Sequence, residues 1–104
     1  MTEGFRSLLV IRANRGAGRE ITRLYTELSI FEKAAQMPGF RSAELLTSTR
    51  DPDELIVIGA WDSSEAYDAW LASPVRVALS VELEPLFAED LEATPWHVLL
   101  THPG

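Results

Sequence analysis

Residues 54–74 read ELIVIGAWDSSEAYDAWLASP, and this stretch contains the two patterns that decide the fold. Its first part, 54–62, is a short apolar run rich in Ile, which is typical of a buried β-strand. Asp62 follows as a candidate helix N-cap, and Glu65 three residues later completes a capping box. A helix is therefore predicted from Asp62 onwards. It should bend just before Pro74, because proline disfavours the α conformation in the residue that precedes it.

The segments on either side supply three further strands. Short apolar runs predict strands at 5–13, FRSLLVIRA, and at 40–49, FRSAELLTST, and a last strand is predicted at 96–102, WHVLLTH. Asp51 and Pro52 suit the first two positions of a type I turn. The strand at 40–49 should therefore form a hairpin with the next strand along the chain.

Two helical regions complete the pattern. Apolar residues recur at helical spacing over 19–37 until Pro38 stops the helix, and they recur again over 75–91. The preceding Gly-Ala-Gly at 16–18 predicts a turn, because it lacks the remaining glycine of a dinucleotide-binding fingerprint. The order strand, helix, strand, strand, helix, strand predicts an α+β fold, the ferredoxin-like split β-α-β with an antiparallel sheet. One domain is expected over 1–104.

The charge distribution limits the possible partners. The chain has 104 residues and a net charge of −7, and eight of its nine basic residues lie in 1–50. The second half, 51–104, carries eleven acids and Arg76 alone, which argues against nucleic acid and against anionic membranes as partners. Arg12 and Arg41 are expected to be solvated or to pair with these acids.

Cysteine content and hydropathy exclude further classes. There is no cysteine, so disulfides, iron–sulfur clusters and thiol nucleophiles are excluded. No segment approaches the ~18 apolar residues that span a bilayer. The N-terminal charges have the wrong order for a signal peptide. We therefore expect a cytoplasmic protein.

Two of the predicted strands are apolar on both faces, which a single layer of helices does not explain. Antiparallel sheets covered on one side normally keep the other side polar. We therefore expect a homodimer in which two sheets meet face to face and close into an α/β barrel. The alternating residues are Leu9 and Ile11 against Leu8 and Val10, and Leu55 and Val57 against Ile56 and Ile58.

The segments MPGFRSAELLTS (37–48) and DPDELIVIGAWDSSEAYDAWLASP (51–74) resemble the antibiotic biosynthesis monooxygenase family of dimeric α/β-barrel proteins. The shared features are the Pro-Gly-Phe turn, the leucine pair, the strand ending in Trp-Asp-Ser, and the Tyr and Trp that follow. This family includes cofactor-independent oxygenases of aromatic polyketides and quinols, haem-degrading proteins and many members of unknown role. The resemblance implies a pocket between the sheet and the helices.

The resemblance also implies site residues. Trp61 and Tyr67 match the pocket Trp and Tyr of the polyketide oxygenases. Val57 stands where those oxygenases have an Asn. Ser80 stands near their helical Arg, for which Arg76, one turn earlier, is a possible substitute. Trp61, Tyr67, Arg76 and His97 are the catalytic candidates. Leu9, Val57, Trp70, Leu79 and Ser80 are the substrate-binding candidates.

Several of these residues also have purely structural interpretations. Trp61 and Tyr67 could simply fill the seam between the sheet and the helices, and Trp70 could belong to the core or to an interface. His97 could be a titratable base or a hydrogen-bonded structural residue. His97 and His102 are five residues apart on the predicted last strand and point to opposite faces, so they do not share a metal.

Three functions follow from these interpretations. The first is a cofactor-independent monooxygenase, without metal, acting on a small aromatic phenol or quinol with dioxygen. The second is a non-oxidative polyketide cyclase or isomerase with the same pocket, and the third is a non-catalytic ligand-binding protein. Haem is not expected, because Leu9 and Leu79 stand where the haem-degrading branch has its Asn and its axial His.

Overall fold

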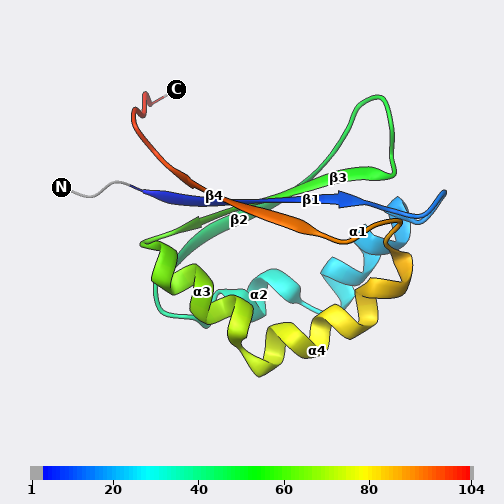
Figure 1. Ribbon diagram of the computed structural model, residues 1–104, viewed down its shortest axis with the longest axis horizontal. Helices are drawn as coiled ribbons and strands as arrows, with labels where there is room; N and C mark the ends of the chain where they lie inside the picture. The colour runs from blue at the N-terminus through cyan, green and yellow to red at the C-terminus, as the bar shows by residue number, and fades with distance from the viewer. Residues whose placement is uncertain (1–3, 104) are drawn as a thin grey trace.

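The computed structural model describes residues 4–103, and its elements follow the predicted order (Figure 1). One short 3₁₀ turn, η1, separates the last helix from the last strand. The elements are β1 (Phe5–Arg12), α1 (Gly18–Glu27), α2 (Ile30–Ala34), β2 (Phe40–Thr47), β3 (Glu54–Trp61), α3 (Ser64–Ala72), α4 (Pro74–Leu83), η1 (Glu84–Leu86) and β4 (Glu92–His97).

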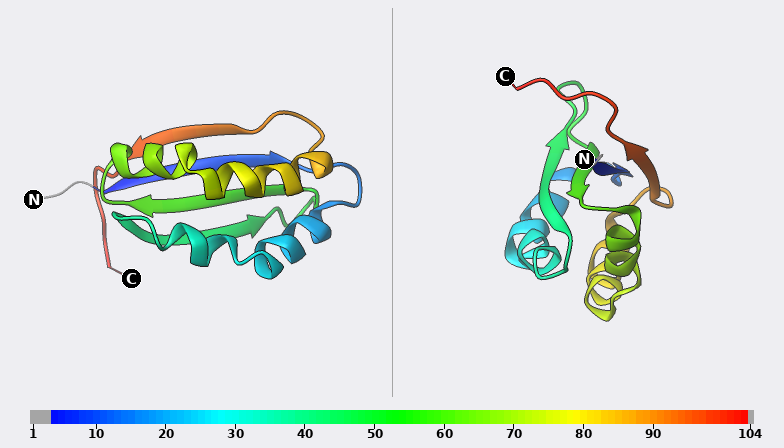
Figure 2. Two further views of the ribbon diagram at one scale, coloured as in Figure 1. Left: turned by 90° about the horizontal axis from the view of Figure 1, so that it is seen from below. Right: turned by 90° about the vertical axis from the view of Figure 1, so that its left-hand side faces the viewer.

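The sheet has the order β2-β3-β1-β4, and all its described pairs are antiparallel. This order confirms the predicted split β-α-β arrangement. The helices of residues 4–103 all lie on one face of the sheet, and none of them covers the other face (Figure 1). Figure 2 shows the helices as two columns, α1 with α2 and α3 with α4, side by side on that same face. The fold therefore places a sheet floor beneath two helical walls.

The alternation of β1 shows how the two faces of the sheet differ. Phe5, Ser7, Leu9 and Ile11 point towards the helices and are buried, whereas the residues between them are half-buried. Ile11 packs in the centre of the core, where it is fully buried together with Ile21 and Leu55. Burying a side chain of this size contributes about 1.5–3 kcal/mol to stability, so these contacts hold the helices against the sheet.

The opposite face of the sheet is open in the single chain and carries a group of apolar side chains bordered by polar ones such as Arg6, Glu44 and Thr94. Register pairs Leu8 with Ile58 and Val10 with Ile56 on this face, and Leu46 of β2 lies beside Ile56. We call this surface the open sheet face: Leu8, Val10, Leu46, Ile56, Ile58 and Trp96. The prediction of apolar residues on both faces of these strands is confirmed, while the dimer remains a prediction.

The start of α3 differs from the prediction. The N-cap is Ser63, not Asp62, and its hydroxyl accepts a hydrogen bond from Ala66 N at 3.2 Å. Asp62 instead pairs with Arg41 of β2. A serine directly before the helix satisfies the free amide equally well, which leaves the aspartate available to the cation. Arg12 also pairs with acids of the second half of the chain: its Nη1 lies 3.2 Å from Glu54 Oε2, and its Nε lies 3.5 Å from Glu89 Oε1.

Two other predicted elements have different limits. The helix predicted at 19–37 is divided into α1 and α2 by Ser29, whose φ of 51° is left-handed and ends the first helix. The last strand lies at Glu92–His97, not at 96–102. Its last residue, His97, pairs with Phe5, the first residue of β1, and one further bond, from Val98 N to Gly4 O at 2.9 Å, follows beyond the strand.

The Gly-Ala-Gly turn binds the side-chain carboxylate of Asp53. Gly16 N and Gly18 N donate hydrogen bonds to the two carboxylate oxygens of Asp53, at 2.8 and 2.9 Å. Asp53 lies in the β2–β3 hairpin, whose predicted turn is confirmed by the bond from Glu54 N to Asp51 O at 3.1 Å. These bonds join the β1–α1 loop to the hairpin.

Asp53 is expected to make the fold sensitive to acid. The two glycine amides lower the pKa of its carboxyl group below the ordinary value. A folded-state pKa below the unfolded one stabilises the fold above the unfolded pKa, and this contribution is lost as pH falls through the folded pKa. Thermal unfolding between about pH 6 and pH 3 should show Asp53→Asn less stable than the wild type at pH 6, with a smaller further loss on acidification. Asp68→Asn, at an exposed position of α3, should keep the pH dependence of wild-type stability. Parallel profiles for wild type and Asp53→Asn would contradict this prediction.

Candidate functional site

A cavity of about 590 Å³ lies between the sheet and the two helical columns. Residues of β1, β2, β3 and β4 form its floor, α1 and α2 supply one wall, and α3 and α4 supply the other. The segment from Glu84 to Leu91 forms part of its border and includes the acidic residues Glu84, Glu89 and Asp90. The volume is within the usual range for a site that holds a small organic ligand.

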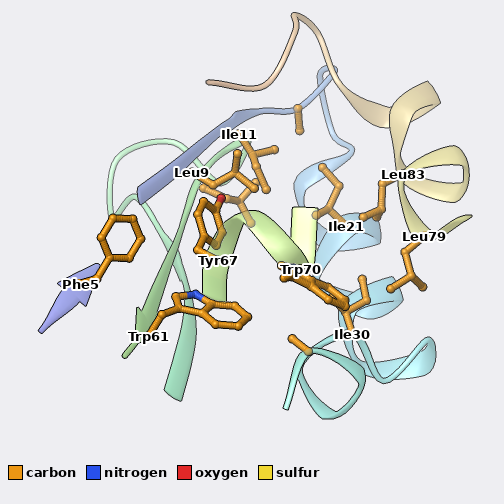
Figure 3. Close-up of a cluster of buried hydrophobic side chains, with 13 residues drawn as sticks. Phe5, Leu9, Ile11, Ile21, Ile30, Trp61, Tyr67, Trp70, Leu79 and Leu83 are labelled. Atoms are coloured by element: carbon orange, nitrogen blue, oxygen red, sulfur yellow. The ribbon is translucent and has the colours of Figure 1, made fainter. Parts of the chain in front are cut away.

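Trp61 and Tyr67 meet in this cavity (Figure 3). Trp61 is the last residue of β3, and Tyr67 lies in the first turns of α3. The tight connection between strand and helix brings their ring centroids to 5.7 Å at an interplanar angle of 54°. Phe40 packs edge-on against Trp61 at 5.2 Å and fixes the orientation of its indole. The two rings offer aromatic surface with one polar atom each.

Arg76 brings a positive charge to the same cavity from α4. Its guanidinium donates to Ser80 Oγ at 3.2 Å, and Ser80 Oγ donates to the Arg76 carbonyl oxygen at 3.0 Å. No carboxylate of residues 4–103 lies within ion-pair distance of Arg76. The lining therefore contains a cation whose charge no described side chain neutralises by direct contact.

Two tyrosines of the lining keep their protons at neutral pH. Burial raises the pKa of Tyr25 to about 12, although the charge of Arg76 acts in the opposite direction. Burial also raises the pKa of Tyr67, against the opposing effects of Arg76 and of the Ser7 hydroxyl. Both phenols therefore act as hydrogen-bond donors, not as bases, in the physiological range.

The structure brings eight of the nine sequence-predicted residues to one cavity. Val57 and Leu9 lie on the floor, and the others come from the end of β3 and from α3 and α4; together they are Leu9, Val57, Trp61, Tyr67, Trp70, Arg76, Leu79 and Ser80. Their roles in binding and catalysis remain predictions. His97 is not part of the lining: it is exposed at the end of β4, where its ring packs edge-on against Phe5 at 6.0 Å.

Among the lining residues that the sequence analysis did not name as site candidates are Ser7, Gly59 and Tyr25. Ser7 is the one polar residue among the helix-facing positions of β1, and strict alternation along FRSLLVIRA would have found it. Gly59 of β3 is its partner in register. Tyr25 lies in the apolar stripe of the first predicted helix, and it could not be told from core because its place over the cavity depends on the break at Ser29.

The described part of the chain contains neither a cluster of metal ligands nor a helix that could span a membrane. In the span from Gly4 to Pro103, no group of three or more His, Asp or Glu side chains is arranged so that it could hold a metal ion. None of the helices in that span has the length and hydropathy needed to cross a bilayer.

The family profile described as antibiotic biosynthesis monooxygenase matches residues 5–79, from β1 to the middle of α4. This match includes the sheet floor as far as β3 and both sides of the cavity. The chain belongs to the antibiotic biosynthesis monooxygenase family. The resemblance predicted from residues 37–74 is therefore confirmed, and no curated protein sequence matches the chain.

Solved structures of similar fold come from several organisms. SnoaB, a cofactor-independent oxygenase from Streptomyces nogalater, is 20% identical, with a TM-score of 0.82 over 99% of this chain and 100% of that chain. Rv0793 from Mycobacterium tuberculosis is 17% identical, with a TM-score of 0.77 over 97% and 99%. A conserved protein from Methanosarcina mazei Go1 is 13% identical, with a TM-score of 0.81 over 94% and 95%. At these identities the likeness is one of fold.

Proposed function

We propose that this protein is a cofactor-independent monooxygenase that oxidises a phenolic or hydroquinone ring of the aromatic polyketide type. The observation that carries the proposal is the meeting of Trp61 and Tyr67 in a 590 Å³ cavity that also contains Arg76. Family membership supports it, and so does the fold shared with SnoaB, which is described as a cofactor-independent oxygenase.

The proposed reaction needs no electron source besides the substrate. A deprotonated, electron-rich phenol can transfer one electron to dioxygen, and the resulting radical pair combines to form a carbon–oxygen bond. In an anthrone, loss of water then converts the ring CH₂ group into a carbonyl. One oxygen atom of dioxygen enters the product and the other leaves as water, while the ring carbon supplies all four electrons.

The lining offers the groups that such a reaction requires. Trp61 and Trp70 present flat faces against which a fused aromatic ring can stack. Tyr67, protonated at neutral pH, can donate a hydrogen bond to a ring oxygen. The charge of Arg76 favours the phenolate over the phenol. Leu9, Leu79 and other apolar residues exclude water from the radical pair.

We also infer that the protein acts as a homodimer. The open sheet face is apolar, and the most exposed of its side chains are Leu46 at 42% and Trp96 at 56%. A second copy would bury this surface by packing its own sheet against it, as in the predicted barrel. The cavity lies on the opposite face, so both copies would keep their sites accessible.

The low polarity of part of the lining favours a second candidate function. Val57 is apolar where the polyketide oxygenases have an Asn, and Ser80 stands near their Arg. A pocket with fewer polar groups suits a cyclase or isomerase that acts on a similar polyketide without dioxygen. Turnover of a ligand with no oxygen consumed would favour this candidate.

Oxygen uptake by the purified protein with a panel of anthrones and hydroquinones tests the proposal, with no metal or flavin added. We expect uptake above the spontaneous rate. Tyr67→Phe, Trp61→Phe and Arg76→Met should each lower the rate by about 10- to 100-fold, because each removes a donor or charge that favours the developing anion.

Trp96→Phe is the matched control for Trp61→Phe, because Trp96 lies on the opposite face of the sheet. It should retain the wild-type rate per site. His97→Asn tests the histidine separately: a loss of rate would mean that His97 takes part from outside the lining. Uptake that equals the spontaneous rate with every substrate, or that survives in all three lining variants, would contradict the oxygenase.

A further inference from the structure

The floor of the cavity contains a buried polar side chain, a serine hydroxyl beside the Tyr67 phenol. Ser7 occupies a helix-facing position of β1 between Phe5 and Leu9, and its side chain is only 4% exposed. Alanine would fill this place in an apolar core at lower cost, because a buried hydroxyl must be hydrogen-bonded to offset its desolvation. Ser7 is part of the cavity lining.

Gly59 brings a second polar atom to the same place. It lies opposite Ser7 in the β1–β3 register and has no side chain to cover the sheet. A Cβ added to Gly59 would lie 2.7 Å from Ser7 Oγ and 2.8 Å from Trp61 Nε1. The hydroxyl of β1 and the indole N–H of β3 therefore converge above the bare backbone of Gly59.

Neither polar atom has its hydrogen-bonding capacity filled by the described residues: the Ser7 hydroxyl interacts with the Tyr67 phenol alone, and the indole N–H of Trp61 has no partner there. No well-formed hydrogen bond links Ser7 Oγ or Trp61 Nε1 to another residue between Gly4 and Pro103, although the hydroxyl approaches the Tyr67 phenol. In the same span, no side-chain N or O that is sealed from solvent lacks a partner. Both atoms must therefore open onto a space that a ligand or solvent can reach, and both residues line the cavity.

We propose that Ser7 Oγ and Trp61 Nε1, above Gly59, form a two-donor niche that binds a ring oxygen of an aromatic ligand and favours its anionic form. We call this place the Gly59 niche. Indole N–H can only donate, and a serine hydroxyl can donate, so the niche suits an acceptor atom such as a phenolate or quinone oxygen. Donors aimed at an anion form stronger hydrogen bonds than the same donors form with a neutral phenol.

The Gly59 niche gives the proposed oxygenase an orientation for its substrate, and in this sense it rests on the proposed function. An oxygen held on the sheet floor directs the attached ring towards the aromatic side chains, which Figure 3 shows rising from β3 and α3. Ser7 is then the residue that selects ligands with an oxygen on the ring edge. Aromatic ligands without such an oxygen should bind more weakly.

The test uses a coloured ligand, 1,8-dihydroxyanthraquinone, whose absorbance changes when its phenol loses a proton. Its dissociation constants from the protein are measured for the neutral and the anionic form by titration below and above its own pKa. We expect Ser7→Ala to weaken the binding of the anionic form by about tenfold or more, while the affinity for the neutral form changes far less. The bound dye in Ser7→Ala should therefore require a higher pH to ionise.

Gly59→Ala is the second variant, because its methyl group would displace both donors, and it should reduce the preference for the anion like Ser7→Ala. Ser7→Thr, which keeps the hydroxyl, should restore most of that preference. Ser42→Ala, an exposed serine of the opposite face, is the matched control and should bind both forms as the wild type does. Thermal unfolding of each variant verifies its fold.

The possible results distinguish failure of the Gly59 niche from failure of the proposed oxygenase. Equal weakening of the two forms in Ser7→Ala, or no weakening, would overturn the niche, and so would a wild-type protein that does not bind the dye. A lost anion preference without any oxygen uptake by the wild type would leave the niche standing and overturn the oxygenase. Oxygen uptake with an unchanged preference in Ser7→Ala would do the reverse.

Discussion

Gly18→Ala is expected to destabilise the protein by about 3 kcal/mol or more, because the added methyl group has no room. Its Cβ would lie 2.0 Å from the backbone oxygen of Pro52 and 2.9 Å from the carbonyl carbon. A backbone carbonyl cannot swing away as the end of a flexible side chain can. The β2–β3 hairpin would have to separate from α1, which would also break the bond from Gly18 N to Asp53.

Gly16→Ala provides the matched comparison for this change. Gly16 has a φ of 82°, but nothing lies within 4 Å of the place where its Cβ would be. Alanine there is strained by the left-handed backbone alone, which costs about 1–2 kcal/mol. Urea unfolding of both variants measures the difference. Equal losses would contradict the steric cost that the close approach of Pro52 is expected to add at Gly18.

Ile58→Glu is expected to convert the proposed dimer into monomers. Ile58 lies at the centre of the open sheet face, paired with Leu8 in the register of β1 and β3. A symmetric interface contains the substituted residue twice, so two unpaired carboxylates would be buried in each dimer. The cost should weaken the dimer by a factor of about 100 or more. Sedimentation equilibrium over a range of concentrations measures it.

Val81→Glu is the control for this variant, since Val81 is an exposed valine of α4 in the helical layer. It should leave the mass of the assembly unchanged, and the circular dichroism of both variants should match that of the wild type. A wild-type protein that sediments as a monomer would contradict the homodimer. A dimer that survives Ile58→Glu would show that the copies meet through another surface.

The order of the elements could be predicted because each has a local cause. Alternation and helical spacing identified the strands and helices, and Pro38, Pro52 and Pro74 marked boundaries through their fixed backbone. The error at the start of α3 arose because two adjacent residues could perform the same local role. Ser63 and Asp62 are both good caps, and only the neighbouring Arg41 decides which of them is free for the helix.

The residues of the candidate site also differ in how far the sequence could predict them. Trp61 and Tyr67 were predicted from the family resemblance, which lies in one contiguous stretch, and a short connection between strand and helix brings the two rings together. Ser7 and Gly59 are 52 positions apart and meet only through the β1–β3 register. A serine in an apolar run and a glycine in a strand carry little meaning separately. Their significance depends on a pairing that the sequence pattern alone does not specify.

The sequence by itself determined the fold class, the order of the elements and the family, because these depend on periodicity, turn residues and a contiguous motif. Tertiary structure decided which side chains share the cavity: it brought Arg76 and Ser80 of α4 to Trp61, added Ser7, Gly59 and Tyr25, and left His97 outside. The physical reason is that strand register and helix packing set these distances. A shift of one residue in register would turn every side chain of a strand to the other face.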